Sequence, residues 1–257
     1  MAQLGINTLM YLNAMKEGTP QSKLLDAIAS YFPIAEVRRE FIAGGDDSQP
    51  AFRAEVDAIR TGVRVHNLTL YYSVPEDFCI GGAVNPRLEQ FLKEANDLNA
   101  VGMKFSVGDV PNTPLAELDA ADKLIAKYNV AVTIENDQST AHGSLEWALK
   151  CMGRLREAGA VHIKFCYDCG NWMWAGVDPD AAFDALLERS AIGEYQIKNV
   201  NKPSDPGHPA PALLEEGIVD WAAQIRRLPG DVPVTLEYPS PLERIDAEVD
   251  IAKRTLR

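Results

Sequence analysis

Residues 132–137 read VTIEND, and the same pattern returns at residues 234–239 as VTLEYP. Each stretch is a short apolar run with a bias to β-branched residues that ends in a glutamate, which is typical of a strand. Side chains alternate between the two faces of a strand, so Glu135 shares a face with Thr133, and Glu237 shares a face with Thr235. Two strands that are far apart in the chain therefore each deliver one carboxylate at their C-terminal end.

Strand and helix patterns alternate along the rest of the chain. Apolar runs predict strands and their loops at residues 4–12, 34–41, 63–74, 101–107, 129–135, 161–168, 192–200 and 232–238. Apolar residues at helical spacing predict helices at 21–31, 51–61, 86–98, 114–128, 144–158, 179–190, 219–228 and 241–256, with Thr113 as a cap before Pro114.

Repeated βα units imply a parallel sheet. The eight units predicted above run through residues 1–257 without a linker-like shift in composition. They predict the α/β class and one domain that is a single (β/α)₈ TIM barrel. An open doubly wound sheet is the alternative, but no GxGxxG follows the first predicted strand.

Composition narrows the class of protein. The chain of 257 residues has a net charge of −12, which argues against a nucleic acid or an anionic membrane as a partner. No apolar run is long enough to span a bilayer, and the N-terminal stretch MAQLGINTLM lacks the basic region of a signal peptide. These features predict a cytoplasmic location.

Four cysteines are too few for a disulfide framework in a protein of this size. Cys166 and Cys169 form a CxxC pair after a predicted strand, which is found in redox-active sites and in half of a zinc site. No second CxxC exists in the chain, so the alternative interpretation is a pair of reduced thiols near the end of a strand.

Oxygen-bearing side chains lie at the ends of four consecutive predicted strands: Glu135, Asp168, Gln196 and Glu237. TIM barrels place their active sites at the C-terminal ends of the strands, so these side chains are expected to point into one mouth of the barrel. A set of oxygen donors suits Mn²⁺ or Mg²⁺ better than zinc or copper. The alternative is that each acid is a capping or surface group.

The motifs VTIEN, YDCGN, YQIKN and LEY, taken as a set, resemble the xylose isomerase-like superfamily of TIM barrels, which includes sugar isomerases, epimerases and hydroxypyruvate isomerase-like proteins. The likeness covers essentially the whole chain. It implies that Glu135, Asp168, Gln196 and Glu237 bind a divalent metal. Gln196 stands where many members have histidine, and Ala141 stands where the epimerases have a further acid.

The resemblance also implies a reaction. Glu135 and Glu237 would act as base and acid, moving a proton next to the carbonyl of a small unphosphorylated sugar or hydroxy-carbonyl compound through an enediolate. A metal-dependent dehydratase acting on a keto-sugar or keto-inositol is the first alternative. A non-catalytic barrel subunit or sugar-binding module is the second. Similar proteins are often dimers or tetramers, which makes a homo-oligomer an expectation.

Further side chains near the strand ends are candidate contacts for a carbohydrate-like substrate. The substrate-binding candidates are Lys104, Asn171, Lys202 and His208. Lys104 has an alternative role in balancing buried acids, as does Lys198. Trp172 and Trp174 could wall a sugar pocket, and His162 is interpreted as a core residue.

Overall fold

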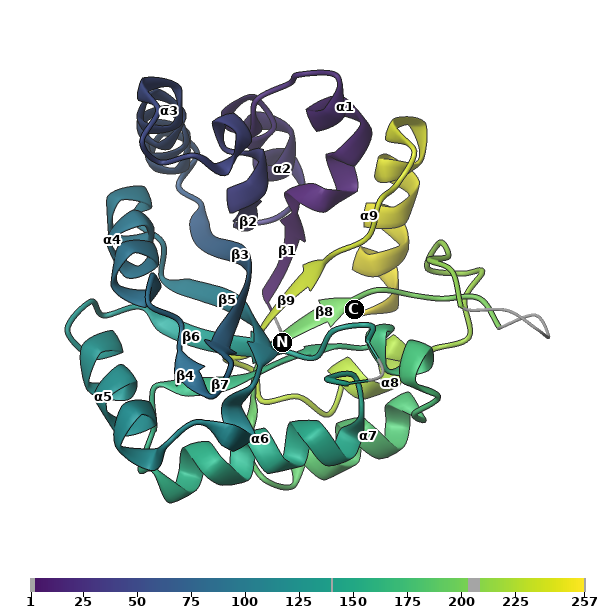
Figure 1. Ribbon diagram of the computed structural model, residues 1–257. Helices are drawn as coiled ribbons and strands as arrows, with labels where there is room; N and C mark the ends of the chain where they lie inside the picture. Colours follow the sequence, from purple (N-terminus) through teal and green to yellow (C-terminus); the bar gives the residue numbers. More distant parts are fainter. Residues whose placement is uncertain (1–2, 140, 203–208, 257) are drawn as a thin grey trace.

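The computed structural model describes residues 3–139, 141–202 and 209–256 (Figure 1). Its centre is a closed barrel of parallel strands. In chain order these are β1 (Gln3–Asn7), β2 (Ile34–Arg38), β3 (Thr69–Ile80), β5 (Gly102–Gly108), β6 (Ala131–Glu135), β7 (Ile163–Asp168), β8 (Ile192–Ile197) and β9 (Pro233–Leu236). The barrel closes because β1 pairs in parallel with both β2 and β9. The predicted α/β class and (β/α)₈ barrel are therefore confirmed.

Helices surround the barrel on the outside (Figure 1). They are α1 (Leu12–Lys16), α2 (Leu25–Tyr31), α3 (Pro50–His66), α4 (Leu88–Leu98), α5 (Leu115–Ile125), α6 (Leu145–Glu157), α7 (Pro179–Leu187), α8 (Trp221–Ile225) and α9 (Ile245–Thr255). Their apolar faces join the outward side chains of the strands, such as Ile134 and Leu236, in one core. Within the described ranges, none of these helices combines the length and hydropathy that crossing a bilayer requires.

Residues 63–66, predicted as the start of a strand, are instead the last turn of α3. Val63 continues the buried stripe of Val56 and Ile59 at helical spacing, so the helix gains apolar burial by extending past its predicted end. The helix stops at Asn67, which adopts the left-handed conformation (φ 53°) common at helix C-termini. The β-branched valines of VRV misled the prediction because tertiary packing outweighs strand propensity here.

Two other local predictions are wrong. Thr113 does not cap α5, since its hydroxyl donates to the carbonyl of Asp109 at 3.0 Å and Pro114 precedes the helix. His162 is not a core residue: it precedes β7, its side chain is 45% exposed, and its Nδ1 lies 2.9 Å from Asp122 Oδ2. A short strand, β4 (Ala83–Val84), was not predicted and pairs antiparallel with the end of β3.

The interior of the barrel is unusually polar. Thr133 on β6 donates to Glu194 Oε2 on β8 at 2.9 Å, and Gln196 Nε2 on β8 donates to Glu36 Oε2 on β2 at 3.2 Å. Neither pair of strands is adjacent in the sheet, so both hydrogen bonds cross the barrel. Barrel interiors are usually filled by branched apolar residues. The polar filling indicates that the inward face of these strands is adapted to bring charges together.

Candidate active site

Three carboxylates meet at the C-terminal mouth of the barrel. Glu135 ends β6, Asp168 ends β7, and Glu237 directly follows β9. One oxygen from each lies within 4.8 Å of the others. Asp168 and Glu237 are buried, whereas the side chain of Glu135 is 14% exposed. The three carboxylates thus lie together at the strand ends, as the sequence predicted.

Two lysines lie among these acids. Lys104 Nζ, from β5, is 2.8 Å from Glu135 Oε2 and 3.1 Å from Glu237 Oε1. Lys198, which follows β8, contacts Asp168 Oδ2 and lies 3.3 Å from Glu237 Oε2. Burial opposes the charge on Lys104, but the surrounding carboxylates outweigh it and raise its pKa well above the usual value. Both amines are therefore cationic and compensate the repulsion between the acids.

Glu237 is the most heavily compensated of the three acids. Besides both lysines, Arg38 Nη1 lies 2.7 Å from its Oε1, and Asn7 Nδ2 donates to the same oxygen at 3.4 Å. Burial would raise the pKa of Glu237, but Lys104, Lys198 and Arg38 outweigh burial and hold the pKa below its ordinary value. Glu237 is therefore ionised at neutral pH.

Asp168 is held by the loop that follows it. Its Oδ1 accepts from the backbone N–H of Gly170 at 2.8 Å and of Asn171 at 3.0 Å. Burial raises the pKa of Asp168 to about 7, against the opposing effect of Lys198. A Cβ on Gly170 would lie 2.3 Å from the carbonyl oxygen of Lys198, so only glycine allows the loop to approach β8 this closely. Close packing against β8 thus explains why the YDCGN motif has a glycine at residue 170.

The side chain of Asn171 connects Glu135 to Lys198. Its Nδ2 donates to Glu135 Oε1 at 3.1 Å, and its Oδ1 lies 3.3 Å from Lys198 Nζ. The side chain is buried and lines a cavity of about 290 Å³ together with Arg38, Lys104, Lys198 and Glu237. A group bound in this cavity would meet amide, ammonium and carboxylate groups within hydrogen-bonding reach of each other.

Gln196 pairs with Asp168 in the register of β7 and β8, but it does not line the cavity. Its Nε2 donates to Glu36, and its Oε1 is buried with no hydrogen-bond partner among the described residues. An unpaired buried amide oxygen is costly, and a cation is one group that would satisfy it. The pKa of Glu36 is raised, mainly by burial.

The donor set fits a divalent metal. It consists of carboxylate oxygens from Glu135, Asp168 and Glu237, and the unpaired amide oxygen of Gln196, the residue paired with Asp168 in the sheet, is a further candidate. Hard oxygen donors of this kind are those that divalent cations such as Mg²⁺ prefer. Because Lys104 and Lys198 contact the same carboxylates, a bound cation requires both amines to move away from at least one oxygen each.

Other predicted site residues are not brought into this cluster. Lys202 is exposed in the segment after β8 and does not line the cavity. His208 lies outside the described residues. Trp172 is fully buried against Phe165 and Tyr167, so it packs the core and does not wall a sugar pocket.

Sequence reasoning missed Arg38, Glu36 and Asn7. Arg38 and Glu36 alternate along β2, so the parity rule that placed Glu135 and Glu237 predicts that both face the barrel interior. Asn7 ends β1 in the same way. The alternation along β2 therefore carried the signal for Glu36 and Arg38.

The cysteines form no part of the cluster of acids. All four are free and buried, and burial raises the pKa of both Cys79 and Cys169 to about 12. Cys169 Sγ donates to the carbonyl oxygen of Lys198 at 3.5 Å and accepts from its backbone N–H at 3.4 Å. Cys169 therefore links the segment after β7 to the residue that follows β8.

We expect the native protein to react with a thiol reagent far more slowly than a free cysteine does at pH 8. At that pH a thiol with a pKa of about 12 is ionised in roughly one molecule in ten thousand, and only the thiolate reacts. Absorbance with Ellman's reagent should show four thiols only after denaturation. Rapid reaction of two thiols in native protein would instead support a redox role for the CxxC pair.

Comparisons with known proteins concern the fold. No protein-family model matches the chain, and no curated protein matches it. Among solved structures, the probable 3-DHS dehydratase AsbF from Bacillus anthracis superposes with a TM-score of 0.73 at 16% identity, over 98% of this chain and 99% of that one. A D-tagatose 3-epimerase-like protein gives 0.72 at 13% identity, over 99% and 97%.

A third similar structure is a xylose isomerase-like TIM barrel protein from Mycobacterium smegmatis in complex with magnesium. It gives a TM-score of 0.67 at 14% identity, over 100% of this chain and 98% of that one. Identities this low show a shared fold over essentially the whole length of each chain. The fold predicted from the strand-end motifs is confirmed.

Proposed function

We propose that this chain, which has the xylose isomerase-like TIM-barrel fold, is a divalent-metal-dependent isomerase or epimerase. The observation that carries the proposal is the convergence of Glu135, Asp168 and Glu237 within 4.8 Å at the catalytic end of the barrel. The substrate is a small unphosphorylated sugar or another hydroxy-carbonyl compound, and the metal is Mn²⁺ or Mg²⁺. Fold likeness to an epimerase-like protein and to a magnesium-bearing barrel supports this class.

When bound, a divalent cation would supply a Lewis acid for the carbonyl of such a substrate. Glu135, Asp168 and Glu237 would hold it, with the amide oxygen of Gln196 as a further candidate donor. Asn171 orients Glu135, since its amide nitrogen donates to Glu135 Oε1 at 3.1 Å and to the carbonyl oxygen of Asn136 at 3.0 Å, and a contact with a substrate hydroxyl would replace one of these hydrogen bonds. Glu135, Glu237 and Asn171 line one cavity, which would hold the reacting carbon against the two glutamates.

Proton transfer falls to the two glutamates. The side chain of Glu135 is 14% exposed and that of Glu237 is 3% exposed, so Glu135 presents the more accessible carboxylate to the cavity. Glu135 therefore takes the proton from the carbon next to the carbonyl, and Glu237, which is ionised, is the base on the opposite face of the same carbon. Return of the proton to the second carbon gives isomerisation, and return to the opposite face of the first carbon gives epimerisation.

Dehydration is the second candidate reaction. Lys198 Nζ lies between Asp168 and Glu237, where an ammonium can protonate a leaving hydroxyl. The same proton abstraction by Glu135 followed by loss of that hydroxyl gives an unsaturated carbonyl product and water. Fold likeness to a probable dehydratase is consistent with this outcome.

Exchange in D₂O with a panel of keto-sugars and keto-acids, followed by NMR, separates these reactions. Deuterium incorporation without loss of a hydroxyl supports the isomerase or epimerase, whereas a vinylic signal supports the dehydratase. If no compound of the panel exchanges in the presence of Mn²⁺ or Mg²⁺, while metal binds, the barrel is a binding module.

We expect metal-free protein to bind one Mn²⁺ per chain when titrated in a calorimeter. Asp168→Asn removes one charged oxygen donor, so it should weaken binding at least about tenfold. Glu146→Gln, on an exposed acid of α6 that pairs with Lys150, is the matched control and should leave affinity unchanged. Equal affinities for all three proteins would place the metal somewhere other than the three carboxylates.

A further inference from the structure

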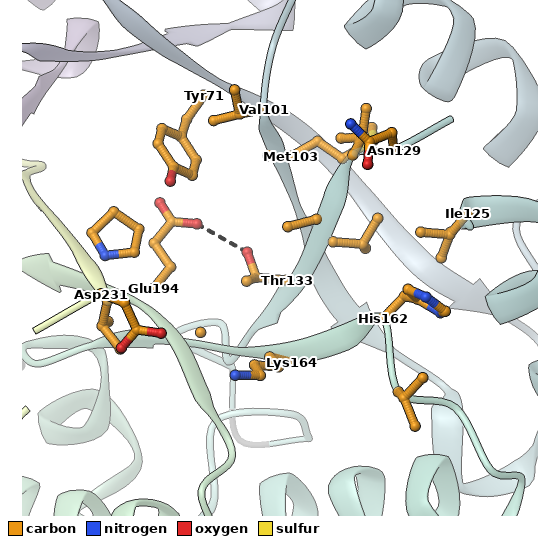
Figure 2. A pocket seen from close by; sticks show the side chains of 18 of the residues that line it. Tyr71, Val101, Met103, Ile125, Asn129, Thr133, His162, Lys164, Glu194 and Asp231 are labelled. Carbon is orange, nitrogen blue, oxygen red and sulfur yellow. Dashed lines mark hydrogen bonds between the residues drawn. The ribbon is translucent and has the colours of Figure 1, made fainter. Parts of the chain in front are cut away.

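A second cavity, of about 610 Å³, lies at the N-terminal mouth of the barrel (Figure 2). The first residues of β5, β6 and β9 line it, so it lies at the end of the barrel opposite to the three carboxylates. Its volume falls within the range of small-molecule sites, which is about 300 to 1,000 Å³. The proposed reaction uses none of its residues.

The polar half of this cavity is built around Glu194. The side chain is 2% exposed; its Oε2 accepts from Thr133 at 2.9 Å, and its Oε1 has no hydrogen-bond partner in the described part of the chain. In Figure 2 the hydroxyl of Tyr71 points toward the same carboxyl group. A buried carboxyl with an unpaired oxygen, at the edge of a cavity, is a position for a hydrogen-bonding ligand.

Two glycines keep the polar half open. A Cβ on Gly102 would lie 2.6 Å from Cε1 of Tyr71, so its absence makes room for the tyrosine ring. A Cβ on Gly193 would lie 2.6 Å from Cβ of Lys164. The ring of Tyr71 and the stem of Lys164 can therefore lie at the mouth without filling it.

The other half of the cavity is largely apolar and reaches the surface. Val101 is 45% exposed and Val161 is 71% exposed, so both present apolar surface there. Four buried apolar residues, Met103, Ile125, Val130 and Val132, also line the cavity, together with the polar side chains of Asn129 and His162. This half suits a hydrocarbon body that covers the exposed valines.

The charges at the mouth select against an ionic head group. Lys164 and Asp231 both line the cavity, so their charges offset each other and leave no net charge from this pair to hold an ionic head group. A carboxylate would also face Glu194. A hydroxyl both donates and accepts, so it can satisfy Glu194 Oε1 whether that carboxyl is protonated or ionised.

We propose that the cavity at the N-terminal mouth binds a small, neutral, amphipathic alcohol. Its hydroxyl bonds to Glu194 beside Tyr71, and its apolar body lies between Val101 and Val161. This cavity is separate from the proposed active site, so the proposal holds whether or not the C-terminal mouth of the barrel is catalytic.

The test uses ¹H–¹⁵N NMR of the full chain titrated with 1-hexanol, and with hexylammonium and hexanoate as matched charged probes. We expect saturable shifts around Thr133, Glu194 and Val161 with 1-hexanol, and at least about tenfold weaker binding of both charged probes. Binding of all three with equal affinity, or no saturable shift with 1-hexanol, overturns the proposal.

Two variants locate the binding. Val161→Glu changes a largely exposed side chain, so the fold should be kept, and a charge in the apolar half should weaken 1-hexanol binding about tenfold. Glu194→Leu removes the hydrogen bond to the hydroxyl and should have a similar effect. Glu146→Gln is the control and should bind as the wild type does. Unchanged affinity in Val161→Glu rejects the site even if Glu194→Leu fails to fold.

Discussion

Replacing Glu237 by glutamine is expected to lower kcat/KM about a thousandfold or more on whichever substrate exchanges in D₂O. The change keeps the shape of the side chain but removes both a charged metal donor and a proton-transfer group, and loss of the latter alone costs about 10²- to 10⁴-fold. Glu237 is also the shared partner of Arg38, Lys104 and Lys198. Steady-state rates at saturating Mn²⁺ measure the effect.

Two comparisons make the result specific to the site. Glu146→Gln should retain the wild-type rate, because that acid is 78% exposed on α6. Circular dichroism should show that Glu237→Gln is folded, so that lost turnover is not lost structure. A variant that is folded and turns over within about threefold of wild type would remove Glu237 from the mechanism.

Replacing Glu94 by glutamine is expected to lower the free energy of unfolding by about 3 to 5 kcal/mol. Arg39 is 5% exposed and makes two hydrogen bonds to Glu94, at 2.8 and 3.0 Å, while Tyr72 donates to the same carboxylate at 2.6 Å. The guanidinium also lies over the ring of Phe91, 5.0 Å from its centroid. Glutamine would leave the buried arginine cation with only the half-exposed Asp47, 3.8 Å away, as an anionic partner.

Urea denaturation of the two proteins measures this loss. Glu89→Gln on the same helix is the matched control, because Glu89 is 54% exposed and pairs only with surface groups such as Lys93. It should shift the midpoint little. Coincident unfolding curves for wild type and Glu94→Gln would mean that the Arg39–Glu94 pair does not hold α4 against the end of β2.

The fold could be predicted from the sequence because its signal is repeated. Each βα unit has a β-branched run and a helical stripe, so one wrong boundary does not change the count. The error at residues 63–66 shows the limit: VRV has strand propensity, but burial of Val63 against the core keeps it helical. Thr113 shows another, since a hydroxyl before a proline has several acceptors and bonded to Asp109 instead.

The candidate site was predictable in its acids and in two of its cations. Glu135, Asp168 and Glu237 follow from parity and from the convergence of parallel strand ends. Lys104 and Lys198 were expected to balance buried acids, and both do, but their long side chains leave open from sequence alone which carboxylates each amine contacts. Lys202 and His208 were predicted to bind substrate from their place in the loop after β8, and a place in a loop does not determine where a side chain points.

The ammonium and guanidinium groups of Lys104, Lys198 and Arg38 bear on whether the barrel needs the proposed metal in order to fold. They neutralise the acids from within the chain, so the barrel can fold completely before metallation. Chelation should therefore leave a folded protein that can be reloaded, unlike small zinc domains that unfold on losing their ion. An entering ion must outcompete tethered amines, so the ion found in the cell will depend on which divalent cations are abundant there.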